Sequence, residues 1–296
     1  MSLFKKKKKV VTHDGSFHPD DVFAVAVISL FEKGCIDIQR TRDERFLKDA
    51  DYVVDVGGIY DPDNNLFDHH QPSGAGMRAD GSPYAAFGLV WKKFGILLSE
   101  SQEAAERIEK RLVEPTDILD NGSSSKKPLQ DDIYQYDLSS IIFAFHSTWK
   151  EKERSEDDAF FDLVKYAELL LVREIKKMSD KIEGEAKVQE IYEKTADKRI
   201  IELDADYSWG DVLKKYPEPL FVITPENGNF HVRAVRDNPN EFKNRCDFPA
   251  SWAGLRGSEL AKITGVPDAV FCHSNRFLAV AKSKAGAETL AELALK

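Results

Sequence analysis

The stretch of residues 9–34 reads KVVTHDGSFHPDDVFAVAVISLFEKG, and it decides how the first part of the chain folds. Residues 9–12 are typical of a short buried strand, and residues 23–31 form an apolar run of helical length. Pro19 suits the first position of that helix, and the two aspartates after it complement the positive end of the helix dipole. The stretch therefore predicts a strand and then a helix, with His13 at the carboxyl end of the strand.

The segments after this helix continue the pattern of an open sheet. Residues 36–38 alternate as a second strand, residues 52–56 contain a third that ends at Asp55 and a Gly-Gly turn, and residues 66–67 lead a fourth into Asp68. Polar residues therefore stand at strand ends, where open α/β sheets bind their ligands. We expect an α/β fold whose N-terminal domain has a mainly parallel sheet flanked by helices.

The chain is expected to divide into a catalytic domain, a connector and a smaller domain. These parts are a metal-binding domain at residues 1–155, a helical connector at residues 156–197 and an α+β substrate-binding domain at residues 198–296. The connector is one long helical pattern, which we expect to break near Gly184 because glycine is a poor helix former. In the last part, strand-like runs alternate with short helices, and Asn227-Gly228 is a strong hairpin turn.

Composition limits the classes of protein to consider. The chain has 296 residues, 42% of them hydrophobic, which is enough for one large or two ordinary domains. No apolar run approaches the roughly 20 residues of a membrane span, so we expect no membrane partner. No segment resembles a signal peptide, which predicts a soluble, cytoplasmic protein, while the lysines at residues 5–9 suit either a solvated lead-in or a nuclear address. The pattern leaves the oligomeric state open.

Charge and cysteine content narrow the choice further. Three widely spaced cysteines without a Cys-x-x-Cys pair argue against a disulfide framework or a cysteine-rich zinc site. The formal net charge of −9 argues against polyanion binding over the whole surface. A local basic groove is compatible with that charge, and bound cations would offset part of it.

Histidines and carboxylates gather in the first quarter of the chain. His13, His18 and Asp20 can converge at the mouth of the first strand, although an aspartate at a helix start also serves simply as a dipole complement. Asp55, at a strand end, is well placed to bridge two cations, since one carboxylate can share its oxygens. A surface turn is the competing explanation for Asp55.

Asp68-His69-His70 is the most specific segment. Adjacent histidines leave a strand on opposite faces, so both can serve one site only where the backbone turns. One can bind a metal while its neighbour meets the substrate. Asp117 or Asp120 can supply a last carboxylate, although the turn that follows Asp120 explains that residue without a metal.

This set of side chains predicts a particular chemistry. Imidazole and carboxylate together suit Mn²⁺, Fe²⁺, Co²⁺ or Zn²⁺, whereas Mg²⁺ prefers oxygen ligands alone. Two such ions about 3.5–4 Å apart can activate water and clamp both oxygens of a phosphoryl displacement. We therefore expect two divalent cations, Mn²⁺ first and Mg²⁺, Co²⁺, Fe²⁺ or Zn²⁺ as alternatives. No Gly-x-Ser-x-Gly elbow supports a serine hydrolase instead.

Six motifs in this order resemble a known family. They are H-x4-H-x-D-D at 13–21, D-V-G-G at 55–58, F-D-H-H-Q at 67–71, D-I-L-D-N-G at 117–122, F-P-x-x-W-x-G-L-R at 248–256 and A-V-F-x-H at 269–273. The sequence resembles the DHH phosphoesterase superfamily and, within it, the Myg-type (melanocyte-proliferating-gene) nuclease branch. The resemblance implies a two-domain fold, Mn²⁺-type phosphodiester hydrolysis and 3′-to-5′ exonuclease activity on RNA.

The resemblance also implies roles for single residues. Two metal ions share Asp55, the first also held by His13 and His18, the second by Asp20, His69 and Asp117. His70 contacts phosphate or assists proton transfer, and Asp68 orients its neighbours. Position 21 departs from the family pattern because it carries Asp where Glu is expected.

The C-terminal part is expected to bind the substrate. Arg256 and His273 are the implied phosphate contacts, and basic residues that include Arg245 and Arg276 can line a track for several phosphates. The competing explanations are an ion pair of Arg256 with Glu259 and a solvated basic face.

We therefore expect a metal-dependent hydrolase that acts on single-stranded nucleic acid or nucleotide phosphates. A 3′-to-5′ exonuclease on RNA or short oligonucleotides is the favoured function. One alternative is a small phosphoanhydride or dinucleotide hydrolase, as in a pyrophosphatase. A second is a non-catalytic nucleotide- or RNA-binding protein of the same fold, which the complete ligand set disfavours.

Overall fold

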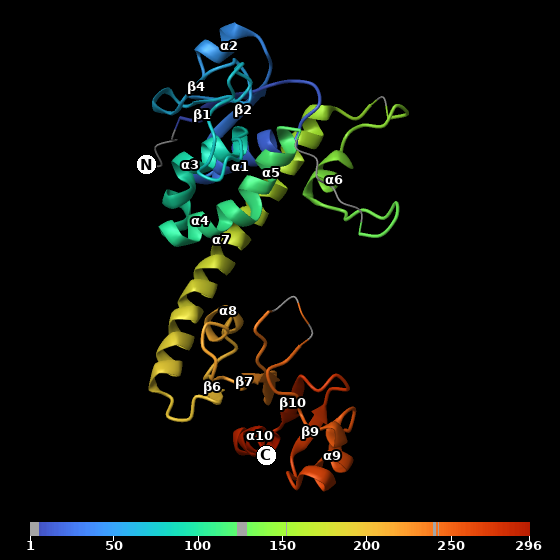
Figure 1. Cartoon of the computed structure of the whole chain (residues 1–296). Helices are drawn as coiled ribbons and strands as arrows, with labels where there is room; N and C mark the ends of the chain where they lie inside the picture. The colour runs from blue at the N-terminus through green and yellow to red at the C-terminus, as the bar shows by residue number, and fades with distance from the viewer. Residues whose placement is uncertain (1–5, 123–128, 152, 239–240, 242) are drawn as a thin grey trace, which may run out of the picture. The chain divides into compact units, whose positions relative to one another are not determined.

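The computed structural model describes residues 6–122, 129–151, 153–238, 241 and 243–296. The chain forms two compact units, Met1–Ser179 and Asp180–Lys296, and each is described by itself. The boundary lies inside α7 (Glu156–Lys194), the long yellow helix of Figure 1. No helix in the described parts of the chain is both long and apolar enough to cross a membrane.

The predicted break in this helix is wrong. Gly184 lies in the uninterrupted helical span, and a β-carbon there would come within 3.3 Å of the Tyr207 ring. The glycine therefore makes room for an aromatic neighbour, and the helix carries it at a propensity cost of about 1 kcal/mol.

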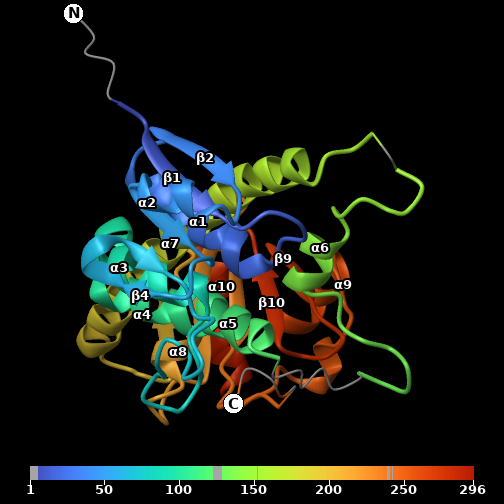
Figure 2. The same cartoon turned by 90° about the horizontal axis from the view of Figure 1, so that it is seen from above.

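The first unit contains a five-stranded sheet with the order β2-β1-β3-β5-β4. Strands β1, β2 and β4 of this sheet are labelled in Figures 1 and 2. The first four of these strands are parallel, and only the β4–β5 pair is antiparallel, which confirms the mainly parallel sheet. The strands are β1 (Lys8–Thr12), β2 (Ile36–Arg40), β3 (Tyr52–Val54), β4 (Tyr60–Asp61) and β5 (Leu66–Phe67).

The main helix pair of this unit is α1 with α3. α1 (Pro19–Phe31) is buried along almost its whole length, and its Phe23 and Phe31 rings meet Phe87 and Phe94 of α3 at centroid distances of 5.2 and 4.5 Å. Burial of such rings supplies much of the driving force for folding. The others are α2 (Glu44–Lys48), α3 (Ala86–Ser99), α4 (Gln102–Ile108), the wider turn η2 (Glu109–Val113), α5 (Glu114–Asp120) and α6 (Leu138–Phe143), with a short turn η1 (Pro62–Asn64) before β5.

The second unit contains a sheet with the order β6-β7-β8-β10-β9, in which only the β6–β7 pair is parallel. The predicted hairpin is confirmed, because Asn227 and Gly228 join β7 to β8 with positive φ angles of 49° and 76°. Residues of α7 cover one face, and a core around Phe221 and Leu260 fills the other. The elements are β6 (Ile200–Glu202), α8 (Gly210–Leu213), β7 (Phe221–Glu226), β8 (Asn229–Ala234), η3 (Ala250–Trp252), α9 (Gly257–Thr264), β9 (Ala269–Cys272), β10 (Leu278–Ala281) and α10 (Lys284–Ala294).

Candidate metal centre

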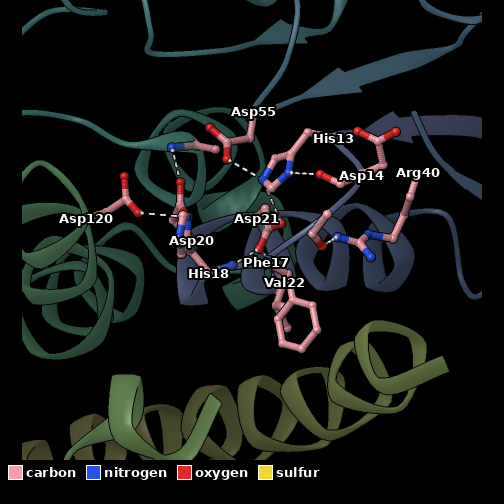
Figure 3. Close-up of polar contacts among 12 residues, drawn as sticks. His13, Asp14, Phe17, His18, Asp20, Asp21, Val22, Arg40, Asp55 and Asp120 are labelled. Carbon is pink, nitrogen blue, oxygen red and sulfur yellow. Dashed lines mark hydrogen bonds and ion pairs between the residues drawn. The ribbon is translucent and has the colours of Figure 1, made fainter. Parts of the chain in front are cut away.

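The carboxyl end of β1 and the start of α1 bring the first polar side chains together (Figure 3). His13 follows β1 directly, and His18 is the residue before α1. Asp20 and Asp21 lie in the first turn of the helix and are fully buried. Asp21 Oδ1 accepts a hydrogen bond from the His18 backbone N–H at 2.9 Å, which leaves Oδ2 to face the cluster.

The ring of His13 is held in one orientation. Its Nδ1–H donates to the Asp14 carbonyl at 3.0 Å, so Nε2 is the atom that faces the carboxylates. Nε2 lies 3.2 Å from Asp21 Oδ2 and 3.3 Å from Asp55 Oδ2. A histidine whose other ring nitrogen donates to a carbonyl is the usual arrangement of a metal ligand.

Asp55 lies between His13 on one side and the adjacent His69 and His70 on the other. It follows β3, and its backbone has a φ of 55°, in the left-handed region that few residues other than glycine adopt. One carboxylate oxygen faces His13, and the other lies 3.3 Å from His69 Nε2 and 3.5 Å from His70 Nδ1. Each oxygen of this buried carboxylate thus meets a different part of the cluster.

A third set of side chains completes the cluster around His69. Its Nε2 lies 3.2 Å from Asp120 Oδ2 and 3.8 Å from Asp20 Oδ2. Asp120 Oδ1 is in turn 3.8 Å from His18 Nδ1. Three groups can therefore hold a metal ion: His13, Asp21 and Asp55; Asp55, His69 and His70; and His18, Asp20 and Asp120.

Unpaired buried atoms show that this cluster suits cations. Among the described residues, four of its buried atoms have no hydrogen-bond partner: Asp20 Oδ1, Asp21 Oδ2, Asp55 Oδ1 and His69 Nε2. Buried polar atoms without partners are costly, and such a concentration at one place needs an explanation. Shared coordination of divalent cations provides one, because metal coordination does not require hydrogen-bond geometry.

The pKa values of the cluster residues also indicate that the cluster favours positive charge. Burial favours the neutral form of His13, but the adjacent carboxylates of Asp21 and Asp55 favour the charged form more strongly and raise the pKa of His13 to about 10. His69 is likewise raised to a pKa of about 10, by Asp120 and Asp55 against burial. Burial, followed by repulsion from neighbouring carboxylates, places the pKa of Asp20 well above its usual range. Two imidazolium protons thus occupy positions where metal ions would supply positive charge.

Asp68 and His70 form a separate pair at the edge of the cluster. Asp68 is buried, and its Oδ1 lies 2.8 Å from His70 Nδ1 and accepts the His70 backbone N–H at 3.1 Å. The His70 side chain is 62% exposed. It lines a pocket of about 610 Å³ together with His13, His18 and Asp55. His70 is therefore the most exposed imidazole of the cluster, followed by His18, whose side chain is 46% exposed.

The structure does not bring Asp117 into any of the three groups. Its Oδ2 lies 2.6 Å from Arg78 Nη2, and its Oδ1 accepts the Gly88 backbone N–H at 3.0 Å. Asp117 therefore faces α3, whereas Asp120, three residues later on α5, reaches the cluster. The ligand role expected for Asp117 has no support in its position.

Asp21 is a residue of the cluster that the sequence interpretation treated only as a helix-dipole complement and not as a metal ligand. The sequence did carry a signal for it, since the second aspartate of His-Pro-Asp-Asp occupies the position where the Myg pattern has an acidic residue. The first helical turn places it beside His13.

The four candidate substrate residues of the second unit differ in how they are held. Arg245 donates to the carbonyls of Tyr216, Pro219 and Lys214 and pairs with Asp237, and its side chain is 9% exposed. Arg276 pairs with Asp247 at 2.8 Å. These contacts give Arg245 a structural role.

Of the other two, Arg256 is exposed and His273 is partly buried. The Arg256 guanidinium lies over the Phe271 ring at 5.1 Å and forms no ion pair with Glu259 or another described carboxylate. His273 Nδ1 accepts the Asn275 backbone N–H at 3.0 Å, and its ring packs against Phe277. Arg256 is therefore an exposed cation that can meet an anionic ligand.

Almost the whole chain matches a known protein family. The MYG1_exonuc family model, described as "Uncharacterised protein family (UPF0160)", matches residues 9–295. The chain belongs to this family. It is 31% identical over 296 residues to the MYG1 protein of Chlamydia muridarum, covering 98% of this chain and 97% of the relative. It is 28% identical over 326 residues to the MYG1 exonuclease of Homo sapiens and 29% over 323 residues to that of Bos taurus, covering 97% of this chain and 85% and 84% of those relatives.

Proposed function

We propose that this MYG1 family member is a two-metal-ion phosphodiesterase of the DHH type, acting as a 3′-to-5′ exonuclease on RNA or short oligonucleotides. The observation that carries the proposal is Asp55, whose two buried oxygens each meet a different group of candidate ligands. The exonuclease names of the human and bovine relatives support hydrolysis of nucleic acid.

The chain's own residues divide into two sets of ligands with Asp55 in common. His13 and Asp21 would hold one ion, and Asp20, His69 and Asp120 the other, with His18 beside Asp20 and Asp120. Mixed nitrogen and oxygen ligands suit Mn²⁺. When bound, the metal pair supplies an activated water and positive charge for the phosphoryl transition state.

His70 supplies the remaining chemistry in this proposal. Asp68 accepts the His70 Nδ1–H, so that Nε2 is free for the substrate. In the imidazolium form, which carries a proton on both ring nitrogens, the Nε2–H would donate a hydrogen bond or its proton to a phosphate oxygen from the exposed side of the pocket.

Hydrolysis assays with metal-defined protein test the proposal. Labelled single-stranded RNA, single-stranded DNA, short oligonucleotides and pyrophosphate are each incubated with Mn²⁺, with EDTA, and with the Asp55→Asn variant. We expect Mn²⁺-dependent shortening of RNA from its 3′ end and loss of both metal and activity in the variant. Asp63→Asn, which changes an exposed carboxylate of the same unit, is the matched control.

Three results would contradict the proposal. Wild-type metal content in Asp55→Asn would remove the bridging role, and binding of RNA without hydrolysis of any substrate would favour a non-catalytic protein. Turnover of pyrophosphate or dinucleotides alone would replace the exonuclease with a small-molecule hydrolase.

A further inference from the structure

A second pocket adjoins the metal pocket within the first unit. It has a volume of about 710 Å³ and shares Arg42, Val56 and Gly57 with the metal pocket. We name it the Leu47 pocket, after the residue of α2 that lines it.

The lining of the Leu47 pocket is mainly apolar. Val53 and Val56 are buried at 4% and 7% exposure, and Leu47 and Leu66 pack against them. Ile59, in the loop after the Gly-Gly turn, also lines the pocket and is 54% exposed. An open hollow with such walls gains stability when a planar apolar group displaces its water.

Gly57 lies in the backbone turn on the border between the two pockets. Gly57 has a φ of 96°, and a β-carbon on it would come within 3.1 Å of Leu47 Cδ2. Only glycine gives both this backbone angle and this close approach, so the partition stays thin.

Arg42 supplies a cation on the same border. Its side chain is 61% exposed, and Nε lies 3.3 Å from Oδ1 of the exposed Asp14. An exposed pair of this kind contributes little to stability, so Arg42 can turn to a phosphate at little cost.

We propose that the Leu47 pocket binds the nucleobase of the nucleotide whose phosphate lies at the metal centre; this inference rests on the proposed function. A nucleotide joins an apolar ring face to an anionic phosphate through one sugar, and the adjoining pockets offer an apolar hollow, a cation and metal ligands in that relation. Besides Arg42, the polar residues of the lining are Glu44, Lys48 and Asn64, which are all exposed to solvent. The buried part of the wall is apolar, so the pocket favours the presence of a base more than its identity.

Two phosphodiesters that differ only in the base test this inference. The probes are the p-nitrophenyl ester of adenosine 5′-monophosphate and the p-nitrophenyl ester of ribose 5-phosphate, which share the scissile bond and the leaving group. We expect wild-type kcat/KM with Mn²⁺ to be about tenfold or more higher for the adenosine ester, in the range that base stacking contributes.

Ile59→Ala should lower that preference to about threefold or less, through the adenosine ester alone. Leu47→Ala should act in the same direction. Leu97→Ala, which changes a 61% exposed leucine of α3 outside both pockets, should keep the wild-type ratio. Calorimetric binding of adenosine 5′-monophosphate and ribose 5-phosphate should change in the same pattern, and the melting temperature and metal content of each variant check the fold.

The outcomes separate the two proposals. Hydrolysis of neither ester by the wild type overturns the proposed function. Hydrolysis of both at equal kcat/KM, or an adenosine preference that survives in both Ile59→Ala and Leu47→Ala, overturns the nucleobase pocket alone.

Discussion

Asp117 and Arg78 form a buried ion pair, with 2.6 Å between Oδ2 and Nη2 and side-chain exposures of 0% and 6%. The same arginine donates to Glu109 at 2.8 Å and to the Pro83 carbonyl at 2.8 Å. Asp117 thus connects α5 to the loop before α3, and its charge is already matched without a metal. The two aspartates of D-I-L-D therefore have different partners: Asp117 pairs with Arg78, and Asp120 lies beside His69.

Substitution of the two aspartates tests these different partners. Asp117→Asn is expected to lower the free energy of unfolding by about 1–3 kcal/mol, because a charge-assisted hydrogen bond to a buried arginine is lost. Its metal content should stay at the wild-type level. Asp120→Asn should show the reverse, with metal lost and stability nearly kept. Urea unfolding measures the stability of both variants, and elemental analysis measures their metal content. Metal loss in Asp117→Asn would show that Asp117 is a ligand after all.

Gly88→Ala tests the space around the same ion pair. A β-carbon at Gly88 would lie 1.8 Å from Asp117 Oδ2 and 2.6 Å from Arg78 Nη2. Glycine to alanine inside a helix ordinarily stabilises by about 1 kcal/mol. Here we expect a loss of stability in urea unfolding, since the ion pair must move. Gly210→Ala, with no atom within 4 Å of the new β-carbon, is the control and should not destabilise.

His69 and His70 should respond differently to removal. His69→Ala is expected to lose metal and activity together, because its Nε2 lies among three carboxylates. His70→Ala should keep most of its metal and lose about 100-fold in kcat, as expected for loss of an acid–base group. Metal content measured beside kcat on one RNA substrate shows the difference. Equal metal loss in both variants would contradict it.

Substitution of two arginines in the second unit should also have different effects, one on stability and one on activity. Arg245→Met leaves three backbone carbonyls without their donor, and we expect a loss of about 2–4 kcal/mol in the free energy of unfolding. Arg256→Lys should leave stability unchanged and lower kcat/KM by about tenfold if this exposed guanidinium binds phosphate. Wild-type kinetics of Arg256→Lys on every phosphate substrate would argue against a phosphate contact.

Asp211 gives a pH-dependent contribution to the stability of the second unit. Hydrogen bonds from Lys181 and then Lys214 lower its pKa to about 2. A depressed pKa stabilises the folded state above the ordinary value of 3.8, and the contribution disappears as the pH falls toward 2. Because the carboxylate is 45% exposed, we expect less than about 1 kcal/mol at pH 6. The stability difference between wild type and Asp211→Asn should therefore shrink between pH 6 and pH 2.5, and a difference that grows would contradict this assignment.

The parallel sheet could be predicted from the order of the strands. The same order predicts that five candidate ligands come together: His13, His18, Asp20, Asp55 and His69. His13 and Asp55 follow neighbouring parallel strands, so any sheet of that order brings them to one edge. The choice between Asp117 and Asp120 could not be predicted, because it depends on how α5 packs against α3. Gly184 illustrates a similar limit, since its intrinsic propensity is known from sequence while the ring of Tyr207 against it is a tertiary fact.

The left-handed backbone of Asp55 gives a way to read other members of the family. Asn and Gly adopt a φ near 55° at least as readily as Asp, so either can replace it without disturbing the strand end. Most other residues would strain the turn. A relative that carries Asn or Gly at this position is therefore expected to fold normally. Under the proposed two-metal mechanism it would lack the bridging carboxylate, so this single position would distinguish a catalytic relative from one that only binds nucleic acid.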